Sequence, residues 1–552
     1  MRFDFSEIYL GKGINYFAND RPLQYLMGFL NQKGNQQLES LGSFVSNEMI
    51  EEAMFIDHYA KPELIMWGVL DNRVNGVWIS PSHSRLLDRL QKFGVIRSSI
   101  PPGSLMTHFL SGYIISDSGL FCTITLTMQT VYALNKYGSK DLVERYLEKF
   151  IRDDNPWYGA TYYTEIQGGS DLGSNATKAE YDGKTWRISG TDKYFASNAG
   201  IADAAIVTAR TKESPAGARG IRVFFVPALR EDGTANYNIR RLKDKLGTVA
   251  VPTGEVELLD SEAYLLGSQE TGIYIALEIL TVSRIDDAIA AAGIARKSLW
   301  EAYLYARRRT AFGKPLADHT LMQRDLVEME AEVEASTFLS VVAAYLFSEA
   351  SNDRPPYGRE YNLARAFSHM AKNTAAWSSD YVTRYSMEVF GGKGFLHEFP
   401  VEKFHRDAVV TSIWEGTTNI QALDFLELLS RKNTLVAIRD YLSTLIDDIS
   451  DKALAGKLRE LLEDSTDRVM KMIASSNPEF RARDIIDLMS FTSAAIIMHA
   501  VSSKAGSSGI MDVAKIYYWK HFKPELREPG TYESAAHWLE WMDVRKKGKT
   551  VN

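Results

Sequence analysis

The segment from Tyr162 to Asp171 reads YYTEIQGGSD and is the most specific stretch of the chain. It lies where a helical pattern gives way to alternating apolar and polar residues. Its paired glycines allow backbone N–H groups to approach a ligand closely, and the hydroxyls of Thr164 and Ser170 can bond a polar ring edge or a phosphate. Taken alone, the segment is also compatible with an ordinary Gly-Ser turn, so the surrounding sequence decides.

The pattern around this segment divides the chain into four parts. Residues 1–156 are mainly helical, and residues 157–267 alternate as strands do, with an apolar run at 223–226. Helical periodicity returns over 268–429, where small residues such as Ala288 and Ala292 permit close helix packing. Residues 430–552 are again helical but more charged. The sequence therefore predicts a multidomain α+β protein with an N-terminal α-helical domain, a middle β-domain, a C-terminal α-helical domain and a helical extension.

Composition narrows the class of protein. The 552 residues are 45% apolar and 24% charged, with a formal charge of −7, so the chain as a whole does not attract polyanions. The single cysteine, Cys122, excludes an intrachain disulfide and thiol-based metal sites, and we expect it to be a small buried residue. The sequence starts without the apolar region of a signal peptide and has no run of about 18 apolar residues. We expect a soluble cytoplasmic protein with no metal and no membrane contact.

A second candidate motif begins about thirty residues after Tyr162. Residues 193–198 read KYFASN, in which an aromatic pair precedes a hydroxyl and an amide. The ring of Phe195 could pack against a planar cofactor while Ser197 bonds it. A strand with one buried face explains Tyr194 better.

Two further segments have the composition of nucleotide-binding loops. Residues 307–313 read RRRTAFG and close a long helix, where arginines favour either the helix dipole or a phosphate contact. Residues 389–395 read VFGGKGF, but they follow a helical pattern and not a strand. That order is a poor match to the Rossmann fingerprint, which argues against a classical NAD-binding unit.

The last segment, residues 412–421, reads SIWEGTTNIQ. Thr417, Thr418 or Asn419 would cap a helix that begins near Ile420, and a helix N-terminus suits an anion or a polar ring. Glu415 lies between Trp414 and a glycine. A carboxylate beside apolar groups can act as a general base near neutral pH, although a solvated loop glutamate is the commoner case.

Taken together and in order, these five segments resemble the signature set of the acyl-CoA dehydrogenase superfamily. They span roughly residues 157–430, and details such as TEIQGGSD at 164–171, RLKDKLG at 241–247 and FGKPL at 312–316 resemble its AidB-like branch. The C-terminal helical extension also matches that branch. The sequence departs from the family at Val249 and Val251, in a loop that often lies near the substrate.

The resemblance implies FAD as cofactor, a four-helix-bundle C-terminal domain, and a dimer or tetramer in which a neighbour touches the flavin. It implies that Glu415 is the catalytic base and that Arg284 lies near the active site. It implies the following FAD-binding residues: Tyr163, Thr164, Gly169, Ser170, Phe195, Ser197, Arg309, Phe312, Gly391, Gly392, Trp414, Thr417 and Asn419. Arg309 and Phe312 would reach the partner's FAD.

Three functions remain open from the sequence. The first is dehydrogenation of a short or branched acyl-CoA, in which a glutamate removes the α-proton and the flavin accepts the β-hydride. The second, implied by the AidB-like resemblance, is a DNA-associated flavoprotein of the alkylation response with little turnover. Its basis here is the basic run Arg545-Lys546-Lys547 with Lys549, and such tails are usually only solvated. The third is a flavin-free structural protein.

Overall fold

The computed structural model describes residues 5–544, and these form two compact units that are each described separately. One unit comprises residues up to 51, 109–116 and those from 287 onward; the other comprises residues 52–108 and 117–286. The long helix α8 (Gly272–Arg308) contributes to both units. The domain boundaries predicted at 156, 267 and 429 come from changes in the sequence pattern, and they stay predictions.

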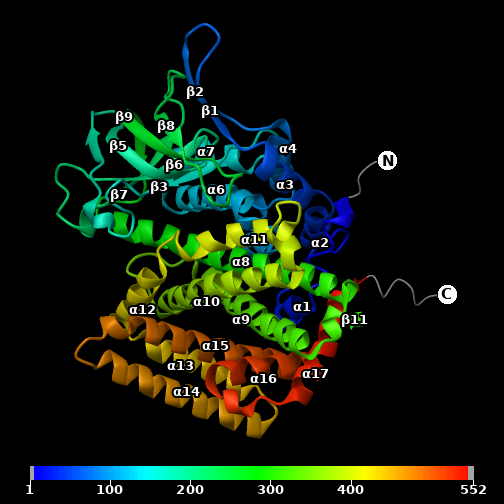
Figure 1. Ribbon diagram of the computed structural model, residues 1–552. Helices are drawn as coiled ribbons and strands as arrows, with labels where there is room; N and C mark the ends of the chain where they lie inside the picture. Colours follow the sequence, from blue (N-terminus) through cyan, green and yellow to red (C-terminus); the bar gives the residue numbers. More distant parts are fainter. Residues whose placement is uncertain (1–4, 545–552) are drawn as a thin grey trace. The chain divides into compact units, whose positions relative to one another are not determined.

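The sheet-containing unit is built on a seven-stranded mixed sheet (Figure 1). The strand order is β3-β6-β7-β9-β5-β4, with β8 paired to β9; β3 runs parallel to β6 and the other pairs are antiparallel. Its strands are β3 (Gly159–Tyr162), β4 (Lys178–Tyr181), β5 (Trp186–Ser197), β6 (Ala204–Ala209), β7 (Arg222–Pro227), β8 (Asn238–Leu242) and β9 (Thr253–Leu265). The apolar run at 223–226 is the buried centre of β7, as the sequence predicts.

Apart from the N-terminal part of α8, the helices of this unit precede the sheet in the chain. They are α3 (Ile50–Tyr59), α4 (Pro81–Lys92), α5 (Leu105–Ile115, shared with the other unit), α6 (Ser118–Tyr137) and α7 (Lys140–Ile151). A hairpin of β1 (Glu63–Trp67) and β2 (Arg73–Trp78) interrupts them, which the helical pattern did not predict. Cys122 on α6 is half-buried, so the expectation of a fully buried cysteine was wrong.

The helical unit is formed around α9 (Thr320–Ala350) and α10 (Arg359–Phe390), which pack along each other. Alanines at 288, 291, 292 and 295 of α8 are fully buried, as the predicted close helix packing requires. The other helices are α1 (Arg21–Phe29), α2 (Gln36–Phe44), α11 (Pro400–Val409), α12 (Thr418–Lys432), α13 (Thr434–Asp447), α14 (Lys452–Ile473), α15 (Ala482–Ala505), α16 (Ser508–Phe522) and α17 (Pro529–Trp538).

The C-terminal extension is helical and belongs to the core of this unit. Of its helices, orange to red in Figure 1, α13, α15, α16 and α17 pack against α9, α10 or α12, and α14 packs on α13 and α15. Two stretches, Thr320–Ala350 and Glu479–Ala505, are long and apolar enough to cross a membrane by length and composition. In the most apolar window of each, 83% and 89% of the residues are buried inside the protein, which is typical of core helices.

Candidate active site

A buried ion pair between Glu165 of the 164–170 loop and Lys193 of β5 holds this loop to the sheet. The Glu165 carboxylate accepts hydrogen bonds from the Lys193 ammonium at 2.9 Å and from the Thr177 hydroxyl and the Ala176 amide at 2.5 and 2.6 Å. Burial alone would raise the pKa of Glu165, but Lys193 and these hydrogen bonds lower it to about 2. The carboxylate is therefore ionised and structural, as its place inside the motif suggests.

The residues that this loop presents suit a flavin. Glycine is required at 169, because a Cβ there would lie 2.3 Å from the Thr164 hydroxyl oxygen. Thr164 itself is half-buried and Ser170 is exposed, which leaves hydroxyl groups at the surface of the loop. The Tyr194 amide donates to the Thr164 carbonyl at 2.9 Å and so fixes the loop beside β5.

On β5 the pairing with β9 shifts register between Lys193 and Ala196, so side chains two residues apart do not share one environment there. The Phe195 ring is 56% exposed, whereas Lys193 is buried. The hydroxyl of Ser197 lies 3.0 Å from that of Thr253 on β9 and is half-buried. An exposed aromatic face beside hydroxyls and a glycine-rich backbone is the donor set that a planar, polar-edged cofactor needs, so the residues fit FAD. Tyr163 and Arg284, also predicted for the site, are buried in this unit.

In the helical unit, Glu415 has a left-handed backbone conformation, with φ of 55°. Such a conformation is rare outside glycine and is found preferentially at functional sites. The Glu415 side chain is half-buried, as is that of Trp414. Helix α12 begins at Thr418, with Thr417 as its extended N-cap residue, so the helix starts two residues earlier than predicted. Thr417 and Asn419 are both exposed.

Buried polar residues from three helices surround this loop. Asp287 on α8 accepts a hydrogen bond from the Trp414 indole and lies 3.4 Å from the Lys372 ammonium on α10. Gln421 on α12 donates to the carbonyls of Glu415 and Gly416 at 3.0 and 2.9 Å. Asp287, Lys372 and Gln421 were not among the predicted site residues. The one sequence signal was Asp287, a charged residue inside the alanine-rich helix α8.

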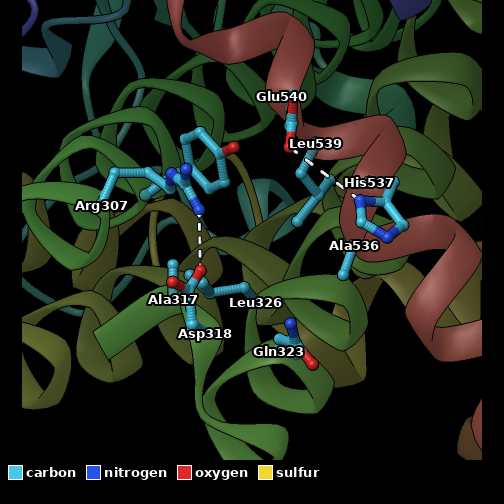
Figure 2. A pocket seen from close by; sticks show the side chains of 10 residues that line it. Arg307, Ala317, Asp318, Gln323, Leu326, Ala536, His537, Leu539 and Glu540 are labelled. Atoms are coloured by element: carbon cyan, nitrogen blue, oxygen red, sulfur yellow. Dashed lines mark hydrogen bonds and ion pairs between the residues drawn. The ribbon is translucent and has the colours of Figure 1, made fainter. Parts of the chain in front are cut away.

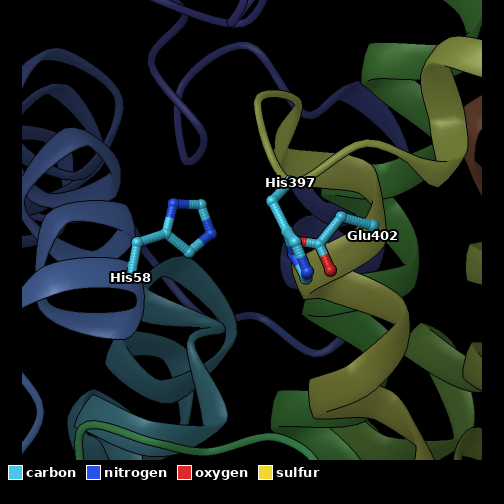
Figure 3. Close-up of side chains that lie close together, drawn as sticks. All are labelled: His58, His397 and Glu402. Atoms are coloured by element: carbon cyan, nitrogen blue, oxygen red, sulfur yellow. The ribbon is translucent and has the colours of Figure 1, made fainter.

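The remaining predicted residues lie on two exposed turns. Gly391 and Gly392 follow α10 in a 3-10 turn (Gly391–Phe395), and Gly391 has φ of 63°, which ends the helix. Beyond this turn, His397 lies 3.1 Å from the Glu402 carboxylate at the start of α11 (Figure 3). Arg309 and Phe312 lie at the hairpin of β10 (Thr310–Ala311) and β11 (Lys314–Pro315), and the Phe312 ring is 98% exposed.

A separate cavity of about 80 Å³ lies in the helical unit between α8, α9 and the last helical turns (Figure 2). Arg307 and Asp318 form an ion pair at 2.9 Å on its wall, and His537 lies 3.9 Å from Glu540. Among the described residues that line it, none is a predicted flavin or substrate residue.

Two protein-family models match the regions that contain these motifs. Residues 160–261 match the acyl-CoA dehydrogenase middle domain, and residues 270–429 match the acyl-CoA dehydrogenase C-terminal domain. Acyl-CoA dehydrogenase family member 11 of Caenorhabditis elegans is 30% identical over 425 residues, which cover 72% of this chain and 68% of that protein. The chain belongs to the acyl-CoA dehydrogenase family.

Other similar proteins belong to the same family. The putative acyl-CoA dehydrogenase AidB of Escherichia coli is 34% identical over 49% of this chain and about half (48%) of its own length. Bovine mitochondrial short-chain specific acyl-CoA dehydrogenase is 34% identical over 52% of this chain and 66% of that protein, just under two thirds. The structure of ACDH-11 of C. elegans in complex with C11-CoA has a TM-score of 0.82 at 24% identity, over 97% of this chain and 95% of that chain, which shows a shared fold.

These findings confirm the predicted family with its AidB-like relatives, the fold class and the cofactor. Acyl-CoA dehydrogenases are FAD-dependent oxidoreductases that act on CH–CH groups. The predicted site residues, the substrate, the subunit number and the cytoplasmic location stay predictions. The basic run proposed for DNA, Arg545-Lys546-Lys547 with Lys549, lies outside the described residues.

Proposed function

We propose that this chain oxidises the α,β carbon–carbon bond of a short or branched acyl-CoA, with Glu415 as the base that removes the α-proton. The conformation of Glu415 is the observation that carries this proposal. A non-glycine residue with φ of 55°, whose carbonyl accepts a hydrogen bond from the side chain of Gln421 on α12, keeps its carboxylate half-buried beside Trp414. A surface glutamate has no need of such a backbone.

The chemistry requires a positioned base because the α-proton of a thioester is only weakly acidic. FAD, when bound, supplies the acceptor for the β-hydride. Glu415 takes up the α-proton on its carboxylate oxygen, so the substrate loses one proton and one hydride and gains a double bond. A general base placed in this way contributes about 10²- to 10⁴-fold to the rate.

The residues proposed to hold the flavin belong to surfaces of the expected chemistry. On the sheet unit, the hydroxyls of Thr164, Ser170 and Ser197 would bond the polar edge of the ring, and the Phe195 ring would cover a face. On the helical unit, Gly391, Gly392, Thr417 and Asn419 would contact the cofactor through exposed backbone and side chains. Arg284 is proposed as a positioning residue near the active site, where it is buried on α8.

Replacement of the proposed base tests this function. We expect Glu415→Gln to fold and to retain FAD but to lose acyl-CoA-dependent flavin reduction by about 10²- to 10⁴-fold, because only proton removal is affected. Flavin absorbance under anaerobic conditions, followed after mixing with butyryl-CoA or isobutyryl-CoA, measures this directly.

Glu427→Gln is the matched control, since Glu427 lies on α12, the helix that follows Glu415, in an exposed ion pair with Arg431 at 3.1 Å. Exposed pairs of this kind contribute little to stability, so this variant should reduce its flavin at the wild-type rate. Equal rates for wild type and Glu415→Gln would remove Glu415 from the mechanism.

A further inference from the structure

We propose that Lys372 and Asp287 are positioning residues for Glu415, which hold the 411–416 loop in the conformation that the base requires. The inference rests on the proposed function, because it takes Glu415 as the base. Neither residue is part of the sequence motifs, and both come from helices outside the loop.

Lys372 connects the two ends of the loop. It is 1% exposed, and its ammonium donates to the carbonyl of Thr411 at 2.9 Å and to the carbonyl of Gly416 at 2.9 Å. Its third partner is the Asp287 carboxylate at 3.4 Å. The two carbonyls accept two of the three ammonium protons, and the nearby carboxylate supplies the opposite charge that a buried ammonium requires.

Asp287 supplies the opposite charge and a second attachment. It is 5% exposed and accepts the Trp414 indole N–H, which fixes the side chain that precedes Glu415. Burial, with a smaller contribution from the charge of Glu415, raises the pKa of Asp287 to about 7, against the opposing effects of the Lys372 ammonium and the Trp414 hydrogen bond.

Gln421 fixes the backbone at Glu415 from the other side. Its amide nitrogen donates to the carbonyls of Glu415 and Gly416, and its amide oxygen accepts from Nδ1 of the buried His369 at 2.8 Å. Carbonyls on both sides of the loop are thus bound to buried donors, whereas the Glu415 side chain stays half-buried and able to meet a substrate. The left-handed backbone persists because the surrounding contacts determine it.

Loss of Lys372 should therefore release the loop and displace the carboxylate. A misplacement of about 1 Å at a reacting group can cost about 10²-fold in rate. For Lys372→Met, studied as the FAD-loaded full chain, we expect the flavin reduction rate constant with butyryl-CoA to fall about 10²-fold. The butyryl-CoA concentration that gives half the maximal rate should change less than about threefold, since the loop positions the base and not the CoA.

Amide hydrogen exchange supplies a readout that does not depend on turnover. In Lys372→Met we expect residues 411–418 to exchange at least about tenfold faster than in the wild type. Lys403→Met is the matched control: Lys403 is a buried lysine on α11 whose ion pair with Asp407, at 2.6 Å, lies within its own helix. This control should leave the exchange of 411–418 and the reduction rate within about threefold of wild type.

A double variant separates positioning from folding. Asp287→Asn with Lys372→Met removes both buried charges, so we expect its melting temperature to exceed that of Lys372→Met while its reduction rate stays low. Recovery of the wild-type rate in the double variant, or wild-type exchange and rate in Lys372→Met, would overturn the inference. A wild-type holoenzyme that no acyl-CoA reduces would instead contradict the proposed function, and the positioning role would fail with it.

Discussion

Glu165 and Lys193 form the buried ion pair that fixes the 164–170 loop. Replacing one partner should lower the free energy of unfolding by a measurable amount. In Glu165→Gln the Lys193 ammonium stays buried without its counter-charge, although Thr208 and Asn175 still accept from it. We expect this variant to lose about 3–5 kcal/mol of unfolding free energy. Adding Lys193→Met should restore part of that loss, as urea unfolding of the single and double variants would show; no recovery would contradict the ion-pair account.

The same pair predicts a pH dependence. The pKa of Glu165 is about 2 in the folded protein, below the ordinary value for a glutamate, so its ionised form stabilises the fold at neutral pH. That stabilisation is complete above the pKa of the unfolded chain and is lost as the pH falls toward about 2. The difference in melting temperature between wild type and Glu165→Gln should therefore narrow as the pH is lowered from 6 to 3, and a constant difference would argue against it.

At the scale of elements, the hairpin of β10 and β11 is a two-residue turn in which Phe312 and Gly313 both have positive φ. Phenylalanine is poorly suited to that conformation, and its ring is 98% exposed in the single chain. Within the chain the ring has an edge-on contact with His319, with ring centroids 6.1 Å apart, and this contact leaves it almost fully exposed. Such an exposed apolar ring fits the proposal that it covers a partner subunit's cofactor.

Phe312→Gly tests this proposal, because glycine suits the turn and the ring contributes no burial within the chain. We expect the free energy of unfolding of the isolated subunit, measured in dilute solution, to change by less than about 1 kcal/mol. Self-association measured by sedimentation velocity should weaken, and FAD should dissociate more readily. Unchanged association and FAD retention would place Phe312 outside an interface.

Several elements of the fold were predictable from the sequence, and others were not. The apolar run at 223–226 predicted β7, and alternation with turn residues predicted strands around it. The motifs predicted the glycine turn after α10 and the loop before α12. The β1–β2 hairpin was missed because its short strands lie inside a helical pattern. Asp287 and Lys372 were missed because they are 85 positions apart in the chain, and only tertiary packing brings an aspartate of α8 to a lysine of α10. The local pattern shows a charged residue inside an alanine-rich helix but not the residue that it pairs with.

For the whole molecule, the central claim is that the FAD-loaded protein accepts electrons from an acyl thioester. Family membership supports the cofactor, and the conformation of Glu415 supports the base. The most direct test is an anaerobic titration of the FAD-loaded wild type with acyl-CoAs of four to twelve carbons, straight and branched, with flavin absorbance as the signal. We predict that at least one short or branched acyl-CoA bleaches the flavin with a stoichiometry near one per bound FAD; full flavin absorbance after excess of every member of the series would contradict the claim.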